Sequence, residues 1–393
     1  MNKEELIVFE QRIADLYDNG HLPYLIHLSG GNEDELLGLF KHINPGDYVF
    51  STHRNHYHYL LHGGSPEVLE QKILDGKSMF IFDRALNFYA SSIVCGTAAI
   101  AAGVAWALKR NGSDQKVWCF LGDGAEDEGH FYEAARYVEA SDLPCTFVIE
   151  DNNRSVIATK RERWGSIPNE WNHFKCVYKY EYKSTWPHGG TGKPGWLKFK
   201  QKAKIPERIP TPELNLVTTT TSLQTSYKEA VDLSMENLAR KGYIFVGYNV
   251  WASDAYGSLK NVPLAQRLET PLAENLMAGL ALGMSMEGFK SVLFFERHDF
   301  IYNALDILVN QADMVFHLSE GEFDFPIIIK AVAGSVKPFY AGPTHTSNLA
   351  SLFRKLFSFP VLDPETPEEV ALAYRLADEF SRPVLISERK ELY

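Results

Sequence analysis

Apolar and polar positions alternate along this chain with the periods of buried helices and strands. Residues 4–17 repeat apolar positions at intervals of one or two helical turns, which predicts an amphipathic helix. The apolar run 117–121 leads directly into the glycine-rich stretch 122–124, which predicts a strand entering a tight turn. Small apolar residues fill 98–108, which indicates a helix packed closely on a sheet.

The same patterns extend over the whole chain. They predict helices over residues 4–17, 33–43, 66–74, 98–108, 128–140, 226–240, 273–286, 300–316, 347–357 and 367–380. They predict strands over residues 48–51, 117–121, 145–149, 243–250, 291–295, 326–332, 361–363 and 383–387. Because strands and helices alternate in both halves, we expect an α/β protein with parallel, doubly wound sheets.

One stretch interrupts this alternation. Residues 198–221 begin with basic residues, contain prolines and end in a threonine run, which is typical of an exposed linker. We therefore expect two domains, residues 1–197 and 225–393, joined by a linker at 198–224. The intervening residues 152–195 show no regular period and are rich in Trp, Tyr, Lys and His.

Composition narrows the class of protein. The 393 residues are 45% hydrophobic and 23% charged, as in ordinary globular proteins. No long apolar run predicts a membrane span, and the charged N-terminus lacks the apolar core of a signal peptide. The net charge of −11 argues against a general nucleic-acid binder. The 4 cysteines form no CxxC pair, so we expect buried free thiols and a cytoplasmic location.

The strongest local signal lies between residues 122 and 153. Gly122-Asp123-Gly124 stands at the end of one predicted strand, and Asn152-Asn153 at the end of the next. One helix and one strand separate them, so Asp123 and Asn153 are expected to meet at the carboxyl edge of the sheet. A carboxylate, an amide oxygen and a nearby main-chain carbonyl suit a hard cation such as Mg²⁺. The glycines and the following helix then favour phosphate groups beside that cation.

Four histidines stand close together at positions 53, 56, 58 and 62. By composition alone they suggest a zinc site. Their spacings of three, two and four residues do not place all of them on one helical face, which argues against zinc.

With the GDG–NN motif, the chain resembles the thiamine diphosphate enzymes of the transketolase-like superfamily. Residues 43–77 and 87–109 are similar to the alpha subunit of the decarboxylating first component of 2-oxo acid dehydrogenases. Residues 267–288, with the TP-x-x-E motif, and residues 299–312 and 361–393 resemble the N-terminal domain of its beta subunit. The resemblance therefore implies an alpha-like and a beta-like domain fused in one chain.

The resemblance also implies roles for individual residues. The metal ligands would be Asp123, Asn153 and the carbonyl of Ser155. The cofactor contacts would be Arg54, Ser92, Val94, Gly122, Gly124, Ala125 and Phe300. The catalytic groups would be Glu274, His56, His188 and His345. Glu274 would bond a ring nitrogen of the aminopyrimidine. A glutamate favoured only by the dipole of a helix N-terminus is the alternative.

The implied activity is that of a thiamine diphosphate- and Mg²⁺-dependent enzyme, with Ca²⁺ or Mn²⁺ as possible substitutes. It would form a carbanion or enamine from a 2-oxo acid, leading to decarboxylation, aldehyde ligation or acyl transfer. Because the family's C-terminal beta domain is missing, we expect an enzyme outside a lipoyl multienzyme complex. Ketol transfer as in transketolase and a non-catalytic assembly partner are the alternatives. We expect a small-molecule substrate, no nucleic acid or membrane as partner, and a homodimer with sites between chains.

Overall fold

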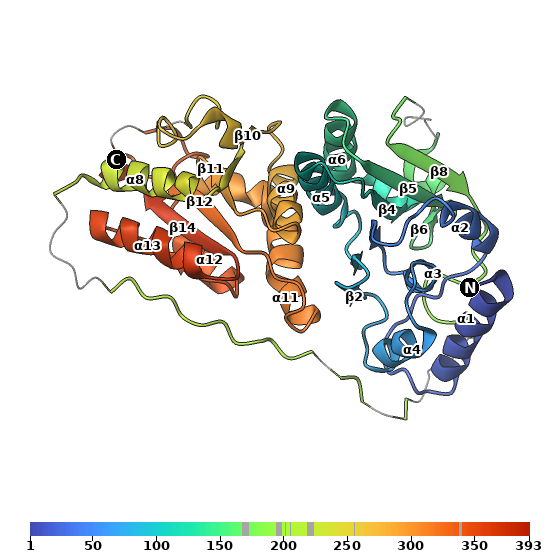
Figure 1. The fold of residues 1–393 in the computed structure, drawn as a ribbon. Coiled ribbons are helices and arrows are strands. Elements are labelled where there is room, and N and C mark those ends of the chain that lie inside the picture. Colours follow the sequence, from blue (N-terminus) through green and yellow to red (C-terminus); the bar gives the residue numbers. More distant parts are fainter. Residues whose placement is uncertain are drawn as a thin grey trace. The chain divides into compact units, whose positions relative to one another are not determined.

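The computed structural model describes residues 1–166, 173–193, 199–200, 202–204, 206–217, 224–254, 256–337 and 340–393. The chain divides into two compact units, Met1–Glu207 and Arg208–Tyr393 (Figure 1). Each unit has its own six-stranded sheet flanked by helices, which confirms the predicted α/β class. None of the described helices is long and apolar enough to cross a lipid bilayer.

The sheet of the first unit has the order β2-β3-β1-β4-β5-β8, and only β2 and β3 pair in antiparallel orientation. Its strands are β1 (Tyr48–Ser51), β2 (Phe82–Asp83), β3 (Phe88–Ala90), β4 (Val117–Gly122), β5 (Cys145–Asp151) and β8 (Val177–Glu181). A two-stranded hairpin, β6 (Arg154–Ser155) and β7 (Ala158–Thr159), follows β5. The central strands β1, β4 and β5 are buried, as expected for parallel strands covered on both faces.

Seven α-helices surround this sheet among the described residues. They are α1 (Lys3–Asp18), α2 (Glu33–Leu39), α3 (His56–Leu61), α4 (Pro66–Leu74), α5 (Ala98–Asn111), α6 (Gly129–Ala140) and α7 (Lys160–Trp164). Helix α5 is almost entirely buried because its alanines let it lie close to β4. The 3₁₀ turn η1 (Asp123–Asp127) connects β4 to α6 and carries the predicted GDG motif.

The second unit has an all-parallel sheet in the order β10-β9-β11-β12-β14-β13. Its strands are β9 (Ile244–Gly247), β10 (Arg267–Glu269), β11 (Ser291–Phe295), β12 (Ile327–Ala333), β13 (Val361–Leu362) and β14 (Val384–Arg389). Its helices include α8 (Tyr227–Arg240), α9 (Glu274–Met286), α12 (Ala350–Leu356) and α13 (Pro367–Glu379). Helices α8 and α13 share one apolar core with the sheet, and α9 packs against β9, β11 and β12.

The structure departs from the sequence-based expectation in a few elements. The predicted helix 300–316 is a succession of short segments: η3 (His298–Ala304), α10 (Leu305–Ile307), the π-helix η4 (Leu308–Asp313) and α11 (Met314–Leu318). Strand β8 lies within residues 152–195, where the sequence shows no period. As an edge strand it is only partly buried, so its charged positions hide the pattern. The short elements α3, β2, β3 and β10 were also not predicted.

The predicted linker at 198–224 is shared between the two units. Its described residues contain no helix or strand, and most are exposed. Residues 198, 201, 205 and 218–223 of the linker lie outside the described part of the chain. The amide of Lys200 donates to the carbonyl of Gly20 in the first unit. The amide of Ile209 donates to His317 Nδ1 in the second unit at 3.0 Å.

A buried ion pair lies inside the second unit. Lys330, in the middle of β12, is 1% exposed, and its Nζ lies 2.7 Å from Glu388 Oε2. The Tyr374 hydroxyl donates to Glu388, and the Lys330 ammonium lies 4.9 Å from the centre of the Phe294 ring. Two opposite charges that are removed from water together stabilise the fold only while both are present.

We expect Lys330→Met to lower the free energy of unfolding by about 3–5 kcal/mol, because it leaves the Glu388 carboxylate buried without its partner. Lys330→Met combined with Glu388→Gln is expected to cost less than the sum of the single changes. Urea unfolding followed by circular dichroism measures these differences. The exposed Lys260 supplies the control: its partner Asp232 is buried but also pairs with Lys228, so Lys260→Met is expected to cost under ~1 kcal/mol. A cost for Lys330→Met as small as that of the control would contradict the prediction.

Candidate functional site

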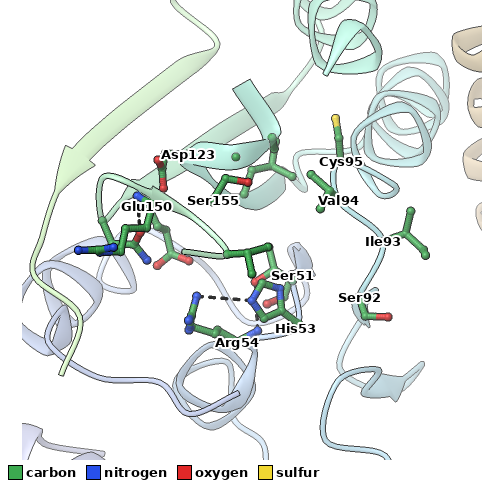
Figure 2. Close-up of a pocket in the computed structure, with 18 of the residues that line it drawn as sticks. Ser51, His53, Arg54, Ser92, Ile93, Val94, Cys95, Asp123, Glu150 and Ser155 are labelled. Carbon is green, nitrogen blue, oxygen red and sulfur yellow. Dashed lines mark hydrogen bonds between the residues drawn. The ribbon is translucent and has the colours of Figure 1, made fainter. Parts of the chain in front are cut away.

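A cavity opens at the carboxyl ends of the central strands of the first unit (Figure 2). The loops after β3, β1, β4 and β5 converge there, as the parallel arrangement requires. Among the predicted site residues, those that line the cavity are Arg54, Ser92, Val94, Gly122, Asp123, Gly124, Ala125, Ser155 and His188. Thus most residues predicted for the alpha-like half are brought together by the fold.

Asp123 is the buried acid of this cavity. Its side chain is 1% exposed, and its Oδ1 has no hydrogen-bond partner. Its Oδ2 lies 3.4 Å from Arg163 Nη2. Burial, and secondarily the nearby charge of Asp151, raises the pKa of the Asp123 carboxyl to about 6. A buried carboxylate oxygen without a hydrogen-bond partner is suited to act as a cation ligand.

The glycine at 124 lets two loops approach each other closely. A Cβ atom at this position would lie 2.7 Å from Ser155 Oγ and 3.1 Å from Ser155 Cβ. The turn after β4 therefore touches the hairpin after β5 without an intervening side chain. This contact places the main chain of the GDG turn beside Ser155, at the edge of the cavity.

The Asn152-Asn153 pair is arranged differently from the prediction. Asn152 lines the cavity, whereas Asn153 is exposed and does not. Asn153 has a left-handed backbone (φ 62°), its amide donates to Asp151 Oδ1, and its Oδ1 accepts from the amide of Lys160. The left-handed backbone of Asn153 follows directly after β5 and turns this side chain away from the cavity, whereas Asn152 faces it, and the role of Asn153 as a metal ligand stays a prediction.

Three histidines from separate loops meet at one side of the cavity. The ring nitrogens of His27, His53 and His188 lie within 4.8 Å of one another. His27 Nδ1 donates to the carbonyl of His188, and Arg54 Nη2 donates to the same carbonyl at 3.2 Å. Burial lowers the pKa of all three imidazoles, that of His27 to about 4, and the Arg54 charge also contributes. They are therefore neutral at pH 7.

The positive charge of the Arg54 guanidinium determines which ligand charge this side of the cavity favours. Arg54 Nη1 lies 3.4 Å from His53 Nε2, and the Arg54 Nε is buried without a hydrogen-bond partner. A metal ion held by the three imidazoles would face this positive charge at close range, whereas an anion would be attracted by it. The group therefore suits an anionic ligand. His27 was not singled out in the sequence, since nothing local shows that it reaches the other two.

His56 lies elsewhere. Both ring nitrogens of this buried side chain are engaged, Nδ1 by Glu10 at 3.0 Å and Nε2 by Ser78 Oγ at 3.0 Å. It does not line the cavity, so its position does not favour the predicted role in proton transfer. His58 contacts Ser51 and Glu150, and His62 contacts main-chain carbonyls. The four histidines of this stretch thus have separate partners.

The segment that approaches the aminopyrimidine in the predicted scheme also borders the cavity. Ser92 and Val94 follow β3 and are both exposed. Cys95, the next residue, has a left-handed backbone (φ 58°) and is buried. All four cysteines are buried and unbridged, which confirms the expectation of free thiols.

The remaining predicted residues belong to the second unit. Glu274 is the first residue of α9 and is half-buried. Phe300 and His345 lie next to each other, with ring centres 5.3 Å apart and perpendicular planes. Helix α9 packs against η3, which carries Phe300. The second unit therefore places Phe300 beside His345, and Glu274 on the helix that packs against the segment of Phe300.

Comparison with known proteins finds a family match in the first unit of the chain. Residues 2–172 match the protein family described as "Dehydrogenase E1 component". The alpha subunit of acetoin:2,6-dichlorophenolindophenol oxidoreductase from Cupriavidus necator is 32% identical over 154 residues, 37% of this chain and 46% of the relative. The alpha subunit of the pyruvate dehydrogenase E1 component from Rickettsia prowazekii is 31% identical over 158 residues, 38% of this chain and 48% of the relative. The chain thus spans about half the length of these curated relatives.

Among solved structures, transketolase from Campylobacter jejuni matches with a TM-score of 0.68 and 16% identity, over 98% of this chain and 78% of that chain. This likeness shows that the chain has a transketolase-like fold. The family match confirms that its first part is related to E1 alpha subunits, as the motifs indicated. The relation of the second unit to a beta subunit stays a prediction.

The neutral histidines predict a dependence of stability on pH. In the unfolded chain His27 takes up a proton below its ordinary pKa of 6.5, whereas in the folded chain it does so only near 4. The free energy of unfolding should therefore fall as the pH is lowered through this window. For His27 alone, the loss between pH 7.5 and pH 5 is about 2 kcal/mol.

Urea unfolding of wild type and His27→Gln at these two pH values tests this expectation. Glutamine keeps a donor for the His188 carbonyl but does not titrate, so the variant should lose less stability on acidification. His42→Gln, at an exposed position of the same unit, should behave as wild type. An equal pH dependence in all three proteins would show that His27 is not held neutral.

Proposed function

We propose that this chain is a thiamine diphosphate-dependent enzyme that acts on a 2-oxo acid, with the diphosphate and a divalent cation, Mg²⁺, bound in the cavity of the first unit. The observation that carries the proposal is the buried, unpartnered Asp123 oxygen in a glycine-rich turn at the end of β4, within the segment that matches the E1 family. When bound, thiamine diphosphate supplies a carbon nucleophile that adds to the substrate carbonyl and accepts the electron pair released with carbon dioxide.

The residues of the cavity fit this ligand by their chemistry. Asp123 offers a carboxylate oxygen to the cation, and Asn152 and Ser155 offer an amide and a main-chain oxygen in the same cavity. Arg54 has a free donor, its Nε, for an oxygen of the diphosphate. The main chain from Gly122 to Ala125 lines the same cavity, and the missing side chain at Gly124 lets this turn lie directly against Ser155.

The neutral imidazoles supply a different function. His53 and His188 line the cavity beside Arg54 and are uncharged at pH 7. Each therefore has one ring nitrogen that can accept a proton from a substrate hydroxyl and one N–H that can donate to a substrate carboxylate. Glu274, Phe300 and His345 are assigned to the aminopyrimidine and the substrate from the second unit.

The cation ligand gives the first test. Asp123→Asn removes the carboxylate at nearly constant size, and we expect it to weaken thiamine diphosphate binding in the presence of Mg²⁺ by roughly 100-fold. Isothermal titration calorimetry measures the affinity, and release of carbon dioxide from a panel of 2-oxo acids measures the activity. Asp142→Asn changes an exposed carboxylate of the same unit and should leave both unchanged.

Two results would go against this assignment. Unchanged affinity of Asp123→Asn would show that this carboxylate does not hold the cation. Tight cofactor binding with no carbon dioxide from any 2-oxo acid, but with transfer from ketose donors, would favour the ketol-transfer alternative.

We also propose a cytoplasmic homodimer outside a lipoyl complex, with each site built from the first unit of one chain and the second unit of the other. The exposed apolar side chains of Val94 and Val156 at the rim of the cavity support a covering partner. Mixing Asp123→Asn with Glu274→Gln under conditions of subunit exchange is expected to restore up to about a quarter of wild-type activity. A shared site yields one intact site in each mixed dimer, whereas sites within one chain would restore none.

A further inference from the structure

Helix α7 is attached by charged side chains to the turn that carries Asp123. Arg163 Nη2 lies 3.4 Å from Asp123 Oδ2, and its Nε lies 2.7 Å from Asp127 Oδ2. Trp164 Nε1 donates to the other Asp127 oxygen at 2.8 Å. The guanidinium thus bridges two carboxylates of η1, the buried Asp123 and the more exposed Asp127.

The two lysines near this bridge form ion pairs with other carboxylates. Lys160 and Lys179 each pair with both Glu126 and Asp151, so these four groups balance one another. Within the described residues, Arg163 is the cation that forms ion pairs with Asp123 and Asp127. The whole cluster joins four carboxylates to three cations and carries one net negative charge.

The net charge of the cluster determines which ligands it can bind favourably. A divalent cation on Asp123 without an anion would leave the cluster positive, with the guanidinium close to the ion in a mostly buried place. A diphosphate that arrives with the cation restores a negative balance. In a protein without Arg163, the cation alone would be enough to neutralise the cluster.

We propose that Arg163 makes the binding of a divalent cation at Asp123 depend on the diphosphate, because its positive charge at Oδ2 of Asp123 opposes a cation at Oδ1 until the anion is present. Asp127 is the carboxylate that retains the guanidinium when the cation takes Asp123, and it already lies 2.7 Å from Arg163 Nε. The coupling is thus a repulsion between two cations on one carboxylate, the guanidinium at Oδ2 and the ion at the unpartnered Oδ1, with Asp127 as a second acceptor for the guanidinium. This inference rests on the proposed function, since it takes Asp123 as the cation ligand.

The test measures Mn²⁺ binding by electron paramagnetic resonance at pH 8, with and without inorganic pyrophosphate, so that no turnover is required. Arg163→Gln should raise the affinity for Mn²⁺ alone by about tenfold and reduce the enhancement caused by pyrophosphate. Asp127→Asn should act in the opposite direction, because it removes the second acceptor and leaves the guanidinium on Asp123. Arg161→Gln removes the same charge from an exposed position of α7 and is the matched control.

The outcomes separate the two proposals. Loss of Mn²⁺ binding in Asp123→Asn, with opposite shifts in Arg163→Gln and Asp127→Asn, supports the coupling. Equal Mn²⁺ affinity in wild type, Arg163→Gln and Arg161→Gln overturns it but leaves Asp123 as the ligand. Unchanged binding in Asp123→Asn overturns the cation site itself. Arg163→Lys keeps a charge and should show an intermediate shift, and it replaces Arg163→Gln if that variant does not fold.

Discussion

The burial of one carboxylate at the end of β4 is the constraint around which the first unit is organised. Asp123 is almost without exposure to water, and one of its oxygens has no partner. A charge in such a place has to be balanced by a cation, by its own protonation or by both. In this chain Arg163 forms an ion pair with Asp123, and Lys160 and Lys179 pair with the neighbouring Asp151. Burial also raises the pKa of Asp123, which favours its protonated form.

The parallel sheet explains why the buried carboxylate and its charged neighbours gather at this position. Loops after β1, β3, β4 and β5 all reach the same edge, so side chains distant in sequence become neighbours. Helix α5 is rich in small apolar residues and packs against β4 and β5. The second unit repeats the architecture with its own sheet, and there a lysine and a glutamate are balanced inside the core. Architecture is therefore shared by the units, whereas the open cavity described above belongs to the first.

The charge of one side of this cavity comes from a guanidinium surrounded by neutral imidazoles. Arg54 is the charged group of the corner, and His27, His53 and His188 surround it without adding charge. The balance favours an anion and keeps nitrogen lone pairs available for protons. The E1 relationship of residues 2–172 agrees with a cofactor that carries a diphosphate, and the transketolase-like fold accommodates both units.

The sequence by itself determined the α/β class, the main helices and strands, and the meeting of the GDG turn with the end of β5. These features follow from local period and from the geometry of parallel strands, which act over short distances along the chain. Only the tertiary structure decided that Asn152 and not Asn153 lines the cavity, and that His56 is held by Glu10 and Ser78 while His27 joins the site. Which way a side chain faces after a strand depends on the backbone conformation of a single residue. Which histidines meet depends on how the fold brings together loops that are far apart in the sequence.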